Sequence, residues 1–117
     1  MGTMLESAVE ERLRKDGYFN FVALFTWPHE ADKVARERFG LYFKDPKKLF
    51  EKTGMDPKYC QGYGLTGART ILVVGLAPSS RALYLYCSEI THDTEIEAKV
   101  YHAVDTNELR DVVYRKP

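Results

Sequence analysis

The feature that most constrains the fold is the run over residues 18–27, which has large apolar side chains on both faces of a period-two pattern. Aromatic residues dominate one face, while Val22 and Leu24 lie on the other. A strand that is apolar on both faces is normally covered on both faces. We therefore predict a central strand here, ended by Pro28, because proline cannot donate a hydrogen bond to a β-ladder.

Period-two patterns predict further strands. Glycines interrupt the pattern over residues 59–65, which favours a weaker, bulged strand. Residues 70–74 form a mainly β-branched run, which is typical of a strand. Residues 95–105 alternate between an apolar face and a mostly charged face, so this strand should have one buried side and one wet side.

Apolar residues spaced by three and four predict helices over residues 29–44 and 78–90. Asp45-Pro46 begins a short additional helix, because aspartate is a favourable N-cap and proline is tolerated in the first turn. Residues 4–16 predict an N-terminal helix and residues 107–114 a short C-terminal helix.

Without those three additional helices the element order is β-α-β-β-α-β, the ferredoxin-like split βαβ pattern. We therefore predict an α+β domain with a four-stranded antiparallel sheet, both crossover helices on one face, a central first strand and an edge last strand. A length of 117 residues suits one domain. Its core would span about residues 18–105, with residues 1–17 as a helical extension.

The helices would cover only one face of the sheet. On the other face, the apolar side chains of two strands, residues 18–27 and 70–76, would be left uncovered. At about 25 cal/mol per Å² of apolar area, exposing several large side chains forfeits several kcal/mol. A second copy packed sheet to sheet would cover them, and symmetric dimers are the commonest oligomers. The alternative is that the N-terminal helix folds over the open face.

Composition argues against several classes of partner. Basic and acidic residues balance at 17 each, so the chain has no electrostatic footprint for nucleic acid or an anionic membrane. Its apolar runs are shorter than a membrane span, and its charged beginning is unlike a signal peptide. Cys60 and Cys87 fit no zinc spacing and are expected as free, partly buried thiols. We expect a cytoplasmic protein that binds neither nucleic acid nor membrane.

The segment ARTILVVGLAPSSRALYLYCSEI, residues 68–90, together with the element order, resembles the dimeric α+β barrel group of ferredoxin-like proteins. It is especially similar to small prokaryotic families described as domains of unknown function. The resemblance covers about residues 19–104 and implies a homodimer. Because this group includes cofactor-free monooxygenases, haem enzymes and ligand-sensing modules, the resemblance implies the fold but does not select an activity.

Candidate ligand-binding residues lie at two places. Trp27 could stack on a ligand and His29 could protonate it, or Trp27 belongs to the core and His29 merely begins a helix. Glu97, Lys99 and Tyr101 share one face of the last strand and could bind a small acidic or phenolic ligand. The alternative is an edge strand kept soluble by charge.

His102 falls on the apolar face of the same strand, so we expect a core histidine hydrogen-bonded to backbone or tyrosine. If that face lines a cavity, His102 could act as a base or a haem ligand. The catalytic candidates are thus His29, Tyr101 and His102. The ligand types in residues 92–95 are adjacent in sequence and rarely converge on one ion, so we expect a polar turn, no metal and no cofactor.

Alternative functions remain open at this point. The favoured one is a homodimer that binds a small, partly aromatic ligand at the sheet face. The others are a cofactor-free or haem-dependent monooxygenase-like enzyme and a purely structural dimerisation module. No nucleophile–base pair and no ligand cluster can be identified from the spacing, which favours binding over catalysis.

Overall fold

Strand β1 (Phe19–Thr26) lies in the middle of the sheet, as its two apolar faces predict. It pairs antiparallel with β3 (Thr70–Ala77) on one side and with β4 (Glu97–His102) on the other. Strand β2 (Cys60–Leu65) pairs antiparallel with β3, which gives the order β2-β3-β1-β4. The predicted central position of the first strand and edge position of the last are both confirmed.

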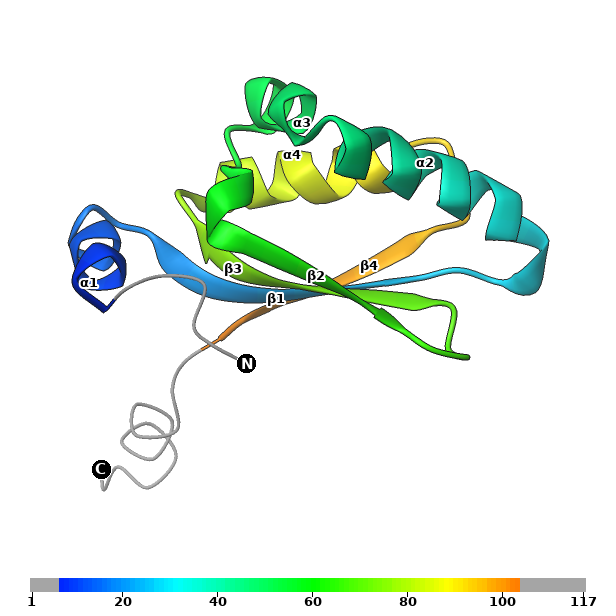
Figure 1. Cartoon of the computed structure of the whole chain (residues 1–117), viewed down its shortest axis with the longest axis horizontal. Coiled ribbons are helices and arrows are strands. Elements are labelled where there is room, and N and C mark those ends of the chain that lie inside the picture. Colours follow the sequence, from blue (N-terminus) through cyan, green and yellow to red (C-terminus); the bar gives the residue numbers. More distant parts are fainter. Residues whose placement is uncertain (1–6, 104–117) are drawn as a thin grey trace.

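The computed structural model describes residues 7–103. Helices α2 (Asp32–Lys44), α3 (Pro46–Thr53) and α4 (Ser80–Thr91) lie on the same side of the sheet (Figure 1). The predicted α+β arrangement of a four-stranded antiparallel sheet with helices on one face is therefore confirmed. The predicted C-terminal helix lies outside the described residues.

Local sequence explains where these helices begin and end. The Asp45 carboxylate accepts a hydrogen bond from the Lys48 backbone amide, and Gly54 ends α3 with a left-handed φ of 85°. The Ser79 hydroxyl accepts from the Ala82 amide at the start of α4, at 3.1 Å. Short 3-10 turns precede α2 and β2, at His29–Ala31 and Pro57–Tyr59.

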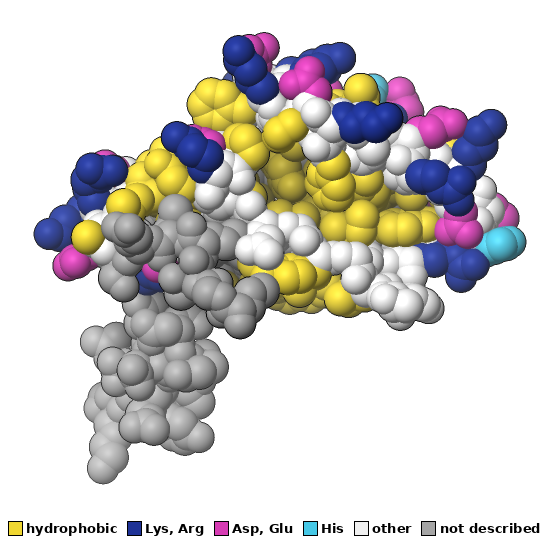
Figure 2. Space-filling model, in the orientation of Figure 1, with side chains coloured by type: hydrophobic (Ala, Val, Ile, Leu, Met, Phe, Trp, Pro, Cys, Tyr) yellow, Lys and Arg dark blue, Asp and Glu magenta, His cyan; other side chains and the backbone are white. Residues whose placement is uncertain are grey.

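The main core lies between the helices and the covered face of the sheet. Phe21, Ala23 and Phe25 alternate along β1 and are all buried on this face. Phe25 meets Phe39 of α2 edge to face, with ring centroids 5.6 Å apart. Figure 2 shows the charged side chains gathered mainly over the helices, and hydrophobic side chains along the middle, between helices and sheet.

The opposite face of the sheet, called here the open face, presents Val22 and Leu24 of β1 beside their partners Val74 and Leu72 of β3. All of these side chains are half-buried. No described element lies across the middle of this face.

Helix α1 (Ser7–Lys15) lies beside one end of the sheet rather than across the open face (Figure 1). Gly17 follows it with a φ of 94°, a conformation that favours glycine. Leu13 of α1 and Leu76 of β3 are buried outside the main core. The described part of the N-terminal helix therefore lies at one end of the sheet and does not cover the middle of the open face.

Candidate functional site

A groove of about 680 Å³ lies between α4 and the edge strand β4, and is called here the α4–β4 groove. Phe19 and Val100 of the sheet and Leu83 of α4 give it apolar walls, while the aromatic ring of Tyr84 is largely exposed at its margin. Pockets of several hundred Å³ with apolar walls and a few polar groups are typical ligand sites. Its polar lining comes from Ser80, Ser88, Thr91 and His102.

His102 lies on the helix side of β4, as predicted, but its side chain is exposed in the α4–β4 groove. Its ring is 5.0 Å from the ring of Phe19, in a tilted arrangement. The prediction of a core histidine is wrong because α4 does not cover this end of β4. Val100, the preceding residue on the same face, is 40% exposed for the same reason, whereas Ile96 is buried.

The structure packs Trp27 into the protein. Its ring lies against Phe39, with centroids 5.6 Å apart, and its Nε1 donates to Asp32 Oδ1 at 2.8 Å. The hydrogen bond from Trp27, followed by the contacts with Arg69, lowers the pKa of Asp32 below its ordinary value. Because both the ring and the indole N–H already have partners, this geometry favours the core interpretation of Trp27 over a stacking platform.

His29 begins the 3-10 turn before α2 and also joins a polar cluster at the end of β1. Its Nδ1 lies 2.7 Å from a guanidinium nitrogen of Arg69 and 3.4 Å from Asp32 Oδ2. Arg69 Nε donates to Asp32 Oδ1 at 3.0 Å. Arg69 comes from the turn between β2 and β3, so the cluster ties that turn to the connection from β1 to α2. Sequence reasoning missed Arg69, and no spacing signal links residues so far apart.

The predicted residues of β4 form a row on the open face. In the register with β1, Glu97 lies opposite Thr26, Lys99 opposite Leu24, and Tyr101 opposite Val22. All of the β4 members are exposed. The structure therefore brings this row together, but it separates the row from the polar cluster around His29.

One member of each predicted group does share a hollow. Trp27 and Glu97 both line a surface depression of about 510 Å³ beside Pro28. Lys99, Tyr101 and His29 do not line it. The five predicted ligand-binding residues thus do not converge on a single site.

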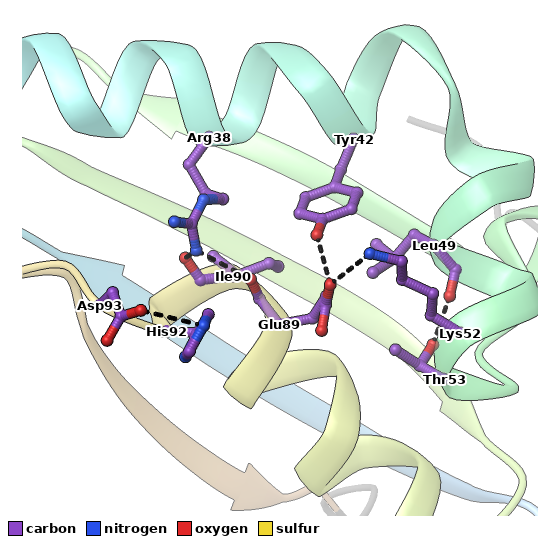
Figure 3. Close-up of polar contacts among 9 residues, drawn as sticks. All are labelled: Arg38, Tyr42, Leu49, Lys52, Thr53, Glu89, Ile90, His92 and Asp93. Atoms are coloured by element: carbon purple, nitrogen blue, oxygen red, sulfur yellow. Dashed lines mark hydrogen bonds and ion pairs between the residues drawn. The ribbon is translucent and has the colours of Figure 1, made fainter.

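A further polar cluster joins the three helices (Figure 3). The Glu89 carboxylate of α4 accepts from the Tyr42 hydroxyl of α2 at 2.7 Å and from Lys52 Nζ of α3 at 2.9 Å. Arg38 of α2 donates to the backbone carbonyls of Glu89 and Ile90 at 3.0 and 3.1 Å. We call this the Glu89 clamp, because it holds α2 and α3 onto α4.

The Glu89 clamp changes the acidity of its members. The hydrogen bond from Lys52, then that from Tyr42, lowers the pKa of Glu89. Burial, followed by the bond to the Glu89 carboxylate, raises the pKa of Tyr42. An ionised Glu89 and a protonated Tyr42 are therefore the stable pair. Because the clamp lies between helices, its arrangement serves packing rather than chemistry.

The two cysteines are free, as predicted. Burial, with a smaller effect from Asp56, raises the pKa of Cys60 to about 12, and burial raises that of Cys87 to about 11. Both thiols therefore stay protonated near neutral pH and are poor nucleophiles.

The turn after α4 is polar. His92 Nε2 and Asp93 Oδ2 are 3.1 Å apart, and both side chains are exposed. Within residues 7–103, no group of three or more His, Cys, Asp or Glu side chains is placed to hold a metal ion. No helix in that range has both the length and the apolar character needed to cross a membrane.

These features describe the chain without assigning it to a family. No protein-family model, no curated protein and no solved structure matches this chain.

Proposed function

We propose that this domain is a homodimeric ligand-binding module of ferredoxin-like topology, which holds a small, partly aromatic molecule in the α4–β4 groove. The observation that carries the proposal is the groove itself, about 680 Å³ with the aromatic rings of Phe19 and Tyr84 and a polar margin. The strand order β2-β3-β1-β4 supports the topology.

The walls of the groove suit a planar apolar body. Phe19, Leu83 and Val100 offer apolar contact, while His102 and Thr91 offer hydrogen-bonding groups at the same site. Such a combination of apolar walls and few polar groups gives affinity through burial and orientation through hydrogen bonds. The ligand we expect is a one- or two-ring aromatic molecule with a polar substituent.

The monooxygenase-like alternative has less support. Of its candidate residues, Tyr101 and His102 point to opposite faces of β4, and His29 lies in the polar cluster with Arg69. A general acid–base pair needs both groups within hydrogen-bonding reach of one substrate. Only His102 among them lines the α4–β4 groove.

Homodimerisation through the open face is the second part of the proposal. Val22, Leu24, Leu72 and Val74 form an apolar centre there, and Lys99 and Glu97 lie toward one margin. A second copy packed sheet to sheet would bury this centre, and an isologous interface places the same apolar patch on both partners.

The groove is tested by binding of two-ring probes, namely indoles and two-ring aromatic carboxylates, measured by ligand-observed NMR. Val100→Trp fills the groove and should abolish binding. Tyr101→Trp is the matched control, since the neighbouring side chain points to the other face of β4. Equal affinities in the two variants, or no binding by the wild-type chain, would contradict the groove as the ligand site.

The dimer is tested by sedimentation velocity at micromolar concentration. The wild-type chain should sediment as a dimer, and Leu72→Glu on the open face should give a monomer. Val34→Glu is the control, because Val34 is exposed on α2, away from the open face. A monomeric wild-type chain would refute the dimer regardless of how the variants fold.

A further inference from the structure

A second, smaller cavity lies on the other side of α4, under α2 and α3 and above β2. Its volume is about 180 Å³, and we call it the Tyr86 cavity. Tyr86 points to this side of α4, whereas the next residue, Cys87, lines the α4–β4 groove. The two spaces are therefore separate, and occupancy of the Tyr86 cavity is independent of the function proposed for the groove.

The absence of a side chain at Gly62 helps create the cavity. Gly62 pairs with the buried Val73 and faces the helices. A Cβ built there would lie 3.6 Å from Phe43 Cζ and 4.0 Å from Val73 Cγ2, at ordinary contact distances. The position thus has room for a side chain that the sequence does not supply.

The Tyr86 hydroxyl is the unusual group of this cavity. The residue is 5% exposed, and its hydroxyl has no hydrogen-bond partner among the described residues. Tyr42, which lines the same cavity, is buried to the same degree but donates to Glu89. Among the described residues no fully buried side-chain nitrogen or oxygen lacks a partner, so the Tyr86 hydroxyl is reached by solvent rather than sealed in the core.

Tyr86 lines the cavity together with Cys60. Burial, followed by smaller effects from Cys60 and Cys87, raises the pKa of Tyr86. The Tyr86 ring packs edge to face against Phe25 and Phe21, with centroids 6.1 and 6.5 Å away. The core thus holds the ring, and the solvent-accessible hydroxyl belongs to a residue that lines the cavity.

Size and charge define what can occupy this space. An apolar cavity of about 150 Å³ can hold benzene, so about 180 Å³ accommodates one ring with a small substituent. All of the lining residues are uncharged, and most are apolar, among them Leu49, Met55 and Pro57. Burying a charged ligand there would be costly, because no opposite charge lines the cavity.

We infer that the Tyr86 cavity binds a neutral, single-ring aromatic molecule whose one polar substituent hydrogen-bonds to the Tyr86 hydroxyl. The phenol class fits best, since a tyrosine hydroxyl both donates and accepts. The ring of the ligand contacts Met55 and Leu49, and its hydroxyl completes the unmet hydrogen bond.

The test adds phenol or toluene to the full chain, and binding is monitored through the NMR signals of the protein. Phenol should bind and give nuclear Overhauser contacts to the Met55 methyl group. Tyr86→Phe should weaken phenol binding about tenfold, the effect of one hydrogen bond, and leave toluene binding unchanged. The phenol-specific loss separates a hydrogen-bonding role of Tyr86 from a purely structural one.

A pair of glycine variants tests the location. Gly62→Val fills the cavity and should abolish the contacts of both probes to Met55, whereas Gly64→Val should keep these contacts as wild type does. Gly64 is the matched control because it lies on the same face of β2 with no atom within 4 Å of an added Cβ. Absence of phenol binding at millimolar concentration, or binding without contacts to Met55, would overturn the inference even if Gly62→Val failed to fold.

Discussion

The two edges of the sheet differ in how the helices cover them. At the β2 edge, small residues (Cys60 and Gly62) face α2 and α3, and these helices lie over the Tyr86 cavity. At the β4 edge, the larger Val100 and His102 face the same side, yet they line the open α4–β4 groove. The position of the helices, rather than the size of the edge side chains, decides which edge is closed.

The Glu89 clamp gives a physical reason for this asymmetry. Glu89 binds Tyr42 and Lys52, so α2 and α3 are held onto α4 on the side of β2. No comparable polar contact among the described residues joins α4 to β4. The closed edge is thus fixed by hydrogen bonds between helices, while the open edge depends on the apolar contacts of α4 alone.

The largest expected effect is a difference in stability loss between a substitution in the packed helix layer and one at the open β4 edge. Phe39→Ala should destabilise the fold by about 3–5 kcal/mol, because Phe39 is 4% exposed and contacts Phe25 and Trp27. Val100→Ala should change stability by less than about 0.5 kcal/mol, as is usual at exposed positions. Urea unfolding measures both, and similar losses would contradict the asymmetry.

Breaking the Glu89 clamp should have the next largest effect. Glu89→Ala removes two hydrogen bonds and leaves the buried Tyr42 hydroxyl without a partner, at a cost of about 2 kcal/mol. Glu37→Ala, at an exposed position of α2, is the control and should be nearly neutral. A small loss in Glu89→Ala would mean that apolar packing alone holds the helices over β2.

Two buried tyrosines sharpen the comparison further. Tyr42→Phe should cost about 1 kcal/mol, since its hydroxyl donates to Glu89. Tyr86→Phe should cost less than about 0.5 kcal/mol, because no described residue bonds to the hydroxyl it removes. Thermal unfolding in the absence of ligand compares them, and an equal loss would show that the Tyr86 hydroxyl has a partner within the protein.

The smallest expected effect is a pH dependence of the closed edge. The pKa of Glu89 is lowered in the folded state, so the unfolded chain binds the proton more readily. The clamp therefore stabilises the fold fully above the ordinary carboxyl value of 4.5, and this contribution is lost as pH falls through the lowered native value. Stability measured by urea unfolding between about pH 3 and 7 should depend less steeply on pH in Glu89→Gln. An unchanged slope would contradict an ionised clamp.

Much of the backbone arrangement could be predicted from the sequence. The apolar faces of residues 18–27 placed β1 at the centre, and the alternation over residues 95–105 indicated an edge strand. The ends of α3 could be predicted because the Asp45 side chain caps its start and Gly54 can adopt the backbone conformation that ends it. These predictions succeeded because periodicity and capping depend on neighbours within a few residues.

The site depended on contacts between distant segments. Periodicity correctly placed His102 on the helix side of β4, but it could not show that α4 leaves this position uncovered. Likewise, Arg69 meets Asp32 and Glu89 meets Tyr42 across 37 and 47 residues of sequence. The sequence alone determined on which face of a strand or helix a side chain lies. The tertiary structure decided whether another element covers that side chain, because burial depends on how separate elements pack.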